Sequence, residues 1–394
     1  MTSQILKKNA TEEAPFETEN VLTIVGGHFV HDTYSAFLPM LLVELQEKLS
    51  LSLTMVGFLT MLSQLPALIN PFIGYLADKI SVRYFIIFAP AVTATVISLL
   101  GNAPNQTAII LLLVMMGISS AAFHAPAPAM IARISGKNVG RGMSWFMAGG
   151  ELGRTVGPLI VVAGIGIWGF DGIYRLLIIG WAASLLLLWR FRSVSSKSEQ
   201  KKPGNFFDAL PQYIAFFLPM FFIVVPRAFL ATSITRFMPI FMKGEGASLV
   251  FAGISLSVLE GAGVVGALIS GSVSDRVGRK PTLIIAMVSA TVMTGLFLLA
   301  KGWLLIPALI MLGFFSLSTQ PVLLALVQDH HPENRATANG LFMFISFLGM
   351  SFSSLLVGMA GDAWGLRTTF LIGALIALVT IPAILALPKE PQTA

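Results

Sequence analysis

The chain has 394 residues, of which 55% are hydrophobic and 11% are charged, and its mean hydropathy is +0.82. Soluble proteins carry about a quarter charged residues, so this composition excludes a soluble domain and indicates a protein that crosses the membrane several times. The net charge of +6 is expected to reflect basic cytoplasmic loops and not nucleic acid binding, and the absence of cysteine excludes disulfides and thiolate chemistry.

The first apolar stretch carries an ionisable cluster, in the sequence Gly-Gly-His-Phe-Val-His-Asp. Its members are His28, His31 and Asp32. At about 100° per residue they share one side of a helix with Ser35. Ionisable groups are costly at membrane depth, so we expect this side to face a partner or a watery cavity. The stretch has no small-residue cleavage site, so we expect a spanning helix and not a signal peptide.

Further apolar segments follow along the chain. A spanning helix needs about 20 apolar residues, and on that basis we predict twelve transmembrane helices, near 21–46, 53–77, 84–101, 107–134, 141–167, 173–191, 212–242, 249–273, 281–300, 303–328, 337–360 and 367–387. The predicted fold class is therefore an all-α membrane protein with two pseudo-symmetric six-helix bundles. The predicted domains are an N-terminal tail (1–20), two bundles (21–191 and 212–387), a basic linker (192–211) and a C-terminal tail (388–394). Lys and Arg concentrate in the tails, the linker and alternate loops, which predicts that both termini are cytoplasmic.

The two halves repeat a short loop motif. Residues 74–79 (Gly-Tyr-Leu-Ala-Asp-Lys) follow the second predicted helix, and residues 271–276 (Gly-Ser-Val-Ser-Asp-Arg) follow the eighth at the same relative position. Repeated halves related by an axis along the membrane normal are typical of secondary transporters. We therefore expect a binding site between the halves, near the middle of the membrane.

Twelve helices in two halves, with G-x-x-x-D-[RK] in both loops, resemble the major facilitator superfamily. In that family the motif is a charge network that gates the cytoplasmic side, and its glycine lets helices approach closely. The resemblance implies transport by alternating access and a set of gating residues, which are Gly74, Asp78, Lys79, Arg83, Gly271, Asp275, Arg276 and Arg279.

The fifth predicted helix carries a charged pair beside a stripe of glycines. Glu151 and Arg154 are three residues apart and can pair on the helix surface, either as a structural ion pair or as part of a site. Gly150, Gly153 and Gly157 form a smooth stripe for close packing against a neighbouring helix. With the proline that follows, the stripe resembles the motif of the superfamily's antiporter branch, which favours export over uptake.

His124 lies in the fourth predicted helix, at about the depth of Asp32. A lone buried histidine is commonly a satisfied core donor, but this depth makes His124 a candidate partner of the first-helix cluster. The pattern His-x-x-His-Asp-x-Tyr in the first helix, together with Phe-His-x-Pro in the fourth, resembles the fosmidomycin-resistance-protein branch of drug exporters. That resemblance implies efflux of small molecules and a role in drug resistance.

Charged and polar residues also interrupt the C-terminal half. Arg227 occupies the position that repeats the first-helix cluster, and Gln320 the position that repeats His124. Glu260 is central in the eighth helix and could pair with Arg227 to hold two helices together. Arg236 lies nearer the outer end, where we expect it to snorkel to the interface. The predicted substrate-binding residues are Arg154, Arg227, Glu260, Gln320 and Tyr34.

These patterns predict a proton-coupled exporter of small organic molecules, with cargo that could be anionic. Asp32 is expected to carry the proton, and His28, His31, His124 and Glu151 to share or tune it, because the reference pKa of histidine lies near physiological pH. The proton gradient would supply the energy without a cofactor, since no Walker lysine loop is present. We expect a monomer in the bacterial inner membrane that binds protons, substrate and lipid, that is not an enzyme and that binds no nucleic acid.

Two other transport functions stay open at this stage. The residues fix coupling better than direction, so a proton symporter of an organic anion or sugar is the first alternative. A transition-metal exporter is the second, because His28, His31, Asp32 and His124 could supply nitrogen and oxygen ligands. A membrane receptor without transport activity is disfavoured by the two gating motifs.

Overall fold

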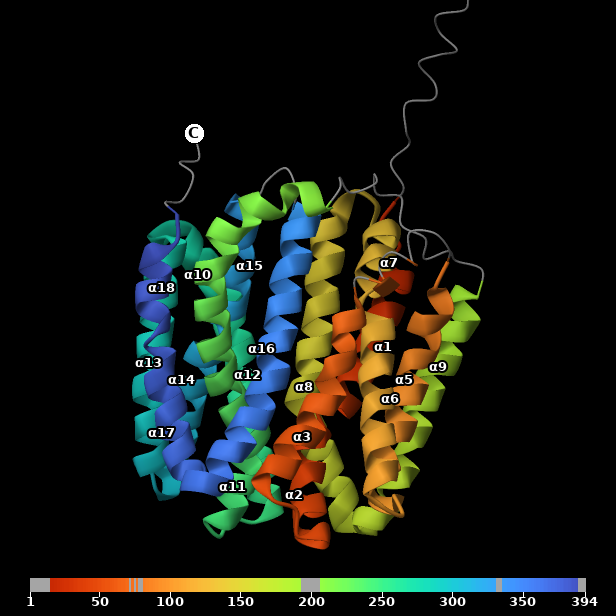
Figure 1. Cartoon of the computed structure of the whole chain (residues 1–394). Helices are drawn as coiled ribbons and strands as arrows, with labels where there is room; N and C mark the ends of the chain where they lie inside the picture. The colour runs from red at the N-terminus through yellow and green to blue at the C-terminus, as the bar shows by residue number, and fades with distance from the viewer. Residues whose placement is uncertain are drawn as a thin grey trace, which may run out of the picture.

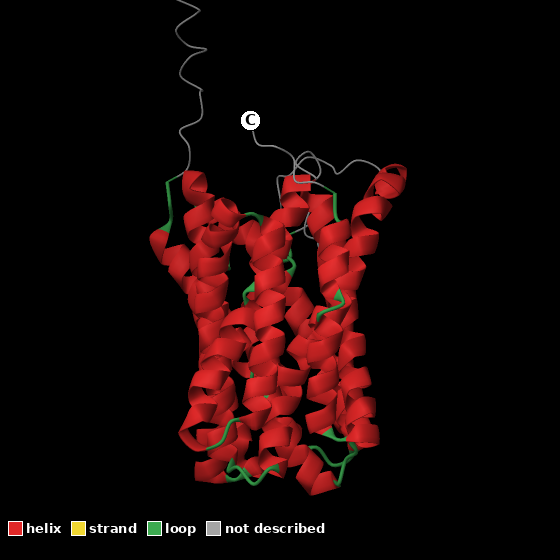
Figure 2. Cartoon of the chain, turned by 90° about the vertical axis from the view of Figure 1, so that its left-hand side faces the viewer, coloured by secondary structure: helices red, strands yellow, loops and turns green. Residues whose placement is uncertain are grey.

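The computed structural model describes residues 15–70, 72–73, 76, 81–192, 206–330 and 335–388. These residues form helices and short connections, and no strand occurs among them (Figure 1, Figure 2). The N-terminal half contains α1 (Thr18–Ser35), α2 (Leu38–Leu49), α3 (Leu53–Gln64), η1 (Leu65–Ile69), α5 (Arg83–Ser98), η2 (Leu100–Asn102), α6 (Gln106–His124), α7 (Ala127–Ile134), η3 (Gly136–Asn138), α8 (Val139–Trp168), η4 (Phe170–Leu176) and α9 (Leu177–Phe191).

The C-terminal half contains α10 (Phe206–Thr232), η5 (Ser233–Phe237), α11 (Met238–Gly244), α12 (Leu249–Val277), α13 (Arg279–Leu299), η6 (Gly302–Leu304), α14 (Leu305–Leu317), α15 (Thr319–His330), α16 (Arg335–Trp364), α17 (Leu366–Ala377) and α18 (Thr380–Ala386). Within the described residues, 10 helical segments are long and apolar enough to cross a membrane. The first predicted span is the pair α1 and α2, and the second begins as α3 and η1 before it enters residues 71–80, which are described only in part. The predicted all-helical membrane fold is confirmed.

Several of the described spans are interrupted, and four of the breaks share a local feature of the sequence. These four breaks lie at Ala36–Phe37, at Ala125–Pro126, at the π-helical turn η5 and at Ser318. A proline lies in or just after each break, and these prolines are Pro39, Pro126, Pro239 and Pro321. Proline has no N–H to donate along a helix, so it ends or bends the hydrogen-bond ladder. Discontinuous helices of this kind line the binding sites of secondary transporters.

The helices run between two ends of one bundle. The described chain begins before α1 and ends after α18 at the same end, which we call the termini end (Figure 1). The opposite end, where α2 and α11 lie, is called the far end. Side-by-side packing of α1 with α8 and of α10 with α16 brings segments distant in sequence together within each half.

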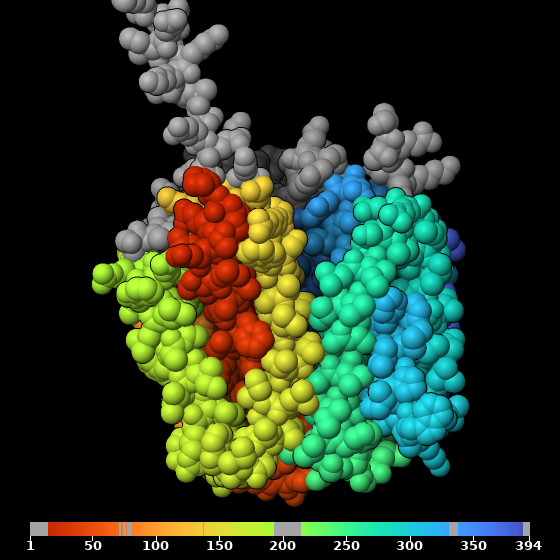
Figure 3. Space-filling model, turned by 180° about the vertical axis from the view of Figure 1, so that it is seen from behind, coloured from red at the N-terminus to blue at the C-terminus, as the bar shows by residue number. Residues whose placement is uncertain are grey.

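The two halves meet at the far end and separate toward the termini end. Contacts between halves are made by α3 with α16, α8 with α12, and α2 with α11. One hydrophobic cluster crosses between the halves, from residues such as Leu41 to residues such as Phe237, whereas the other two clusters each stay within one half. Figure 3 shows α8 and α12 touching below and parting above, with atoms from later helices visible between them. The structure is therefore open at the termini end.

The glycine stripe of α8 packs against α1, as the sequence predicted. A Cβ atom at Gly149 would lie 2.8 Å from the carbonyl oxygen of Val25, and one at Gly157 would lie 2.6 Å from that of Thr33. Backbone oxygens cannot rotate away, so only glycine permits this approach. The close packing places α8 directly against the helix face that carries Asp32.

We expect Gly157→Ala to lower the stability of the protein by about 1–3 kcal/mol, because overpacking at this depth forces the two backbones apart. The measurement is the thermal unfolding temperature of the purified protein in detergent. Gly166→Ala is the matched control, since it lies on the same helix and its added Cβ would meet nothing within 4 Å in the described structure. Equal unfolding temperatures for the two variants would contradict the packing argument.

Candidate functional site

Asp32 is the centre of the intramembrane cluster. Its Oδ2 lies 3.1 Å from Arg154 Nη1 and 3.4 Å from His28 Nε2, and its Oδ1 lies 3.2 Å from His124 Nε2. The other Arg154 terminal nitrogen donates to Glu151. Three helices, α1, α6 and α8, thus supply the partners of one carboxylate. The sequence predicted each of these residues, and the structure brings all five together.

The cluster has a buried side and an accessible side. The Asp32 side chain is 3% exposed, whereas His124 is 33%, Arg154 is 40% and Glu151 is 27% exposed. His28 is buried and stacks on Phe146, with ring centroids 4.0 Å apart. A solute or proton therefore reaches Asp32 past His124 and Arg154, while the apolar ring of Phe146 closes the other side.

The contacts of His28 leave room for one more proton. His28 Nδ1 lies 2.7 Å from the carbonyl oxygen of Phe146. A carbonyl only accepts, so Nδ1 carries the hydrogen, and in the neutral ring Nε2 has a bare lone pair. That lone pair faces the Asp32 carboxylate, which also only accepts. A proton bound between the two would turn this opposition of acceptors into a charge-assisted hydrogen bond.

His31 is beside the cluster but belongs to a different hydrogen-bonded chain. Its Nδ1 lies 3.3 Å from Thr93 Oγ1, Thr93 donates to Ser119 at 2.9 Å, and Ser119 donates to the Ala89 carbonyl. The hydroxyl hydrogens of Thr93 and Ser119 are therefore both donated to other acceptors. His31 Nδ1 must then carry a hydrogen and donate it to Thr93 Oγ1. His31 Nε2 is buried without a hydrogen-bond partner in the described part of the chain, and the ring stacks on Phe123.

The C-terminal half faces this cluster with its own charges. Arg227 is 8% exposed, and its Nε donates to Thr319 at 2.5 Å, beside the half-buried Gln320. The pairing of Arg227 with Glu260 is not found among the described residues. The charge of Glu260 instead interacts with Arg154 of the other half and with Arg236.

Arg236 lies near the charged residues of the candidate site, a place that the sequence did not predict for it. The expectation that it snorkels to the outer interface is wrong, because η5 holds it half-buried near Glu260 and Arg154. Single π-helical turns within α-helices occur frequently at functional sites. The repeat of the two halves was the signal available in the sequence. The turn η5 follows α10 at the position that corresponds to the break after α1.

Tyr34 does not belong to the site. It is 2% exposed, and its hydroxyl donates to the carbonyl of Leu176, the last residue of η4. Both groups lie within the N-terminal half, so this hydrogen bond holds α1 against η4. The sequence predicted that Tyr34 contacts substrate, whereas in the structure its hydroxyl is bound to this carbonyl inside the N-terminal half.

The gating motifs are described only in part. Gly74, Asp78 and Lys79 lie outside the described residues. In the second copy, Arg279 binds both Asp275 and Asp329, the latter at 3.0 Å, and Arg276 is exposed. A Cβ at Gly271 would meet nothing within 4 Å in the described structure, so the close helix approach predicted there is not found in this open state. Arg83 lies over the Tyr84 ring, 5.0 Å from its centroid.

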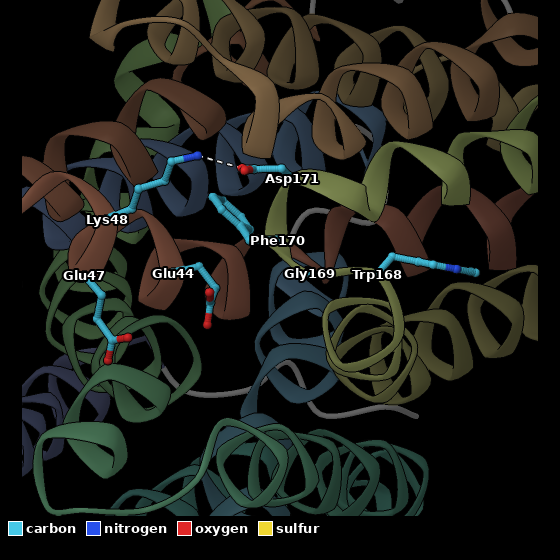
Figure 4. Close-up of a pocket in the computed structure, with 7 residues that line it drawn as sticks. All are labelled: Glu44, Glu47, Lys48, Trp168, Gly169, Phe170 and Asp171. Atoms are coloured by element: carbon cyan, nitrogen blue, oxygen red, sulfur yellow. Dashed lines mark hydrogen bonds and ion pairs between the residues drawn. The ribbon is translucent and has the colours of Figure 1, made fainter.

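A separate pocket opens at the far end, where Lys48 and Asp171 pair at 2.6 Å (Figure 4). It measures about 490 Å³ and is lined by Glu44, Glu47, Lys48, Trp168, Gly169, Phe170 and Asp171. All seven residues come from the N-terminal half. The pocket therefore lies away from the Asp32 cluster, and its Glu47 borders the other half through an ion pair with Lys243.

Comparison with known proteins decides the family. The profile of the Major Facilitator Superfamily matches residues 24–354 and again 263–394. The chain belongs to the major facilitator superfamily. It is a multi-pass membrane transporter, and not an enzyme.

Individual relatives of this superfamily member are distant but cover nearly the whole chain. It is 23% identical to the fosmidomycin resistance protein of Escherichia coli (strain K12), over 89% of this chain and 88% of that protein. It is also 23% identical to YfnC, an uncharacterized MFS-type transporter of Bacillus subtilis (strain 168), over 98% and 97% of the two chains.

Solved structures share the fold. The nucleoside transporter NupG superimposes with a TM-score of 0.74 at 17% identity, covering 93% of this chain and 98% of that one. A bacterial homolog of the human lysosomal transporter Spinster, in an inward-facing and unoccupied conformation, superimposes with a TM-score of 0.76 at 16% identity, covering 94% and 97%.

We expect Arg154→Gln to lower the free energy of unfolding by about 2 kcal/mol, because Asp32 and Glu151 lose their cation in a partly buried site. Adding Asp32→Asn should recover about 1 kcal/mol, since the uncompensated charge is then removed. The measurement is a double-mutant cycle from unfolding in detergent. The exposed pair Lys48 and Asp171 supplies the control cycle, with a coupling of about 0.5 kcal/mol or less. A coupling for Arg154 and Asp32 no larger than the control would contradict the network.

Proposed function

We propose that this transporter is a proton-coupled exporter of small organic molecules. The observation that carries the proposal is the opposition of two acceptors, His28 Nε2 and Asp32 Oδ2, at 3.4 Å in a buried site. One proton shared between the two atoms resolves that opposition with a charge-assisted hydrogen bond. Histidine is the side chain whose unperturbed pKa lies nearest physiological pH, which makes the pair a candidate proton carrier.

The accessible partners connect this proton to cargo. When Asp32 gains a proton it loses its charge, and Arg154 is left with Glu151 and, across the interface, Glu260. Arg154 lies on α8, the helix that packs against α12 of the other half. A change of charge at Asp32 therefore changes the electrostatics between the halves, and with it the free-energy difference between the two access states.

Export requires that proton and cargo exclude each other. They do so when the cargo donates a hydrogen bond or a positive charge to the Asp32 carboxylate, at the place the proton takes. An anionic group would instead bind Arg154, and it would bind best when Asp32 is protonated, so proton and anion would move together. The cluster therefore supports antiport for a donor-bearing cargo and symport for an organic anion.

Two further observations support the direction of transport and the orientation of the protein in the membrane. The name of the fosmidomycin resistance protein, a relative of this chain, favours efflux. The basic loops of the termini end favour a cytoplasmic location for that end, by the bias of Lys and Arg toward the inner side. On this orientation the structure is open to the cytoplasm of a bacterium, where an exporter loads its cargo, and the protein lies in the inner membrane.

Asp32→Asn should abolish proton-driven transport, by about 100-fold or more, while the protein still inserts and folds, because the amide cannot exchange the proton. The assay uses inverted vesicles with an imposed pH gradient and a panel of drugs and metabolites, reading collapse of the gradient. Asp171→Asn, an acid-to-amide change at the far end, is the control and should transport normally. Normal proton-driven transport by Asp32→Asn would contradict the proposal.

The sign of the pH dependence separates antiport from symport. For an exporter, the apparent Kd of cargo should rise as pH falls, by as much as tenfold per pH unit, because proton and cargo compete. For a symporter of an anion, the Kd should fall over the same range. Equilibrium binding to the purified protein measures this, and Asp32→Asn should show a flat profile in either case.

A second candidate function is export of a transition metal. His28, Asp32 and His124 each offer a ligand atom, and these atoms all lie within 4.8 Å of one another. Nitrogen and carboxylate ligands suit Zn²⁺ and its neighbours, although Arg154 places a fixed positive charge on the same carboxylate. Under this function, Zn²⁺ would raise the unfolding temperature of the wild type and not of His28→Ala. No stabilisation by Zn²⁺, Co²⁺ or Ni²⁺ would exclude it.

A further inference from the structure

A carboxylate of one half caps a helix of the other half at the far end. Asp362 lies in the last turn of α16, and its two oxygens accept hydrogen bonds from the backbone N–H groups of Leu53 and Thr54, each at 2.8 Å. These two residues open α3. The contact therefore joins the C-terminal half to the N-terminal half through one side chain.

The position of Asp362 is unfavourable for its own helix. The C-terminal end of a helix carries a partial negative charge, and the N-terminal end a partial positive one. A carboxylate in the last turn of α16 is thus repelled by that helix and attracted by the start of α3. Ser52 already accepts from Met55, so Asp362 and Ser52 together satisfy the free donors of the first turn of α3.

The surrounding seam makes the contact specific to the closed far end. A Cβ at Gly57 would overlap the carbonyl oxygen of Ser354, and one at Gly358 would overlap that of Leu53. Gln64 also donates to Ser354 at 3.1 Å. The backbones of α3 and α16 therefore touch along this seam, and Asp362 lies at its outer edge, exposed to solvent.

The pseudo-symmetric position does not repeat the contact. Helices α8 and α16 end alike, with Trp168 before Gly169 and Trp364 before Gly365, both glycines having positive φ. Two residues before the tryptophan, however, α8 has Gly166 where α16 has Asp362. The start of α12 is capped by its own Ser248, as α3 is by Ser52. Only the α3 side, within the described chain, shows the additional carboxylate from the other half.

We propose that Asp362 is a gating residue that holds the far end closed. Opening that end separates α3 from α16, which leaves the N–H groups of Leu53 and Thr54 without their acceptor until water replaces it. The carboxylate thereby weights the equilibrium toward the state that is open at the termini end. This role does not depend on the cargo, the proton site or the direction proposed above.

The test measures the two ends separately by spin-label distances in the purified protein. The chain contains no cysteine, so labels can be placed on the unaltered background. Glu47→Cys with Lys243→Cys reports the far end, where these residues face each other at 3.5 Å across the halves. Asn138→Cys with Val277→Cys, both exposed, reports the termini end.

Asp362→Ala should raise the ratio of far-end-open to far-end-closed molecules about tenfold, with a matching shortening at the termini end. Asp362→Asn should act less, about threefold, because an amide oxygen still caps a helix. Asp171→Ala, a far-end acid that pairs within its own half, should leave both distributions unchanged. Reciprocal movement at the two ends is required, because a merely loosened interface would lengthen the far-end distance alone.

Unchanged distances in Asp362→Ala, or far-end lengthening without termini-end shortening, would overturn the proposal. If the alanine variant is not recovered folded, the threefold shift in Asp362→Asn decides the question by itself. Neither readout involves transport, so a failure here is distinguishable from a failure of proton coupling.

Discussion

The structure depends on keeping one ionised carboxylate in the middle of a membrane. Asp32 survives there because three helices bring it partners, and the glycines of α8 allow that helix to approach α1 closely enough for Arg154 to reach it. A side chain on that stripe would push away both the arginine and the helix that carries it. Packing and electrostatics at this site are therefore one constraint, which the small residues of α8 and the polar residues of α1 satisfy together.

The interface between the halves adds a second constraint, because it must stay closed in one access state and separate in the other. Buried apolar contact alone would hold the far end without a defined register. The seam of α3 and α16 uses glycine against backbone carbonyls, and it ends on hydrogen bonds to Asp362 that water can replace. Such contacts act only over a short distance. They therefore stabilise the interface while the halves are in contact and contribute nothing once the halves have separated.

The sequence predicted the helices and the core of the site for a physical reason. A charged residue in hydrocarbon has few permitted surroundings, so Asp32, His124 and Arg154 at similar depth implied one cluster. The expectation for Arg236 was based on its depth along the helix, which does not reveal the π-turn that holds it. Tyr34 was predicted at the site although its hydroxyl meets a buried backbone acceptor, which the sequence does not show. Asp362 was not predicted, since its acceptor role is defined by another helix more than 300 residues away.

The interrupted spans have a mechanical consequence. Where a backbone ladder is broken, a helix bends at little cost, since few hydrogen bonds are strained. In α1–α2 and in α10–η5–α11 the break separates a far-end segment from the segment that carries the titrating or cationic side chains. The far-end segments can therefore change their angle at these breaks while the ionisable groups keep their partners. A transporter hinged in this way need not disassemble its cluster of ionisable residues each time it turns over.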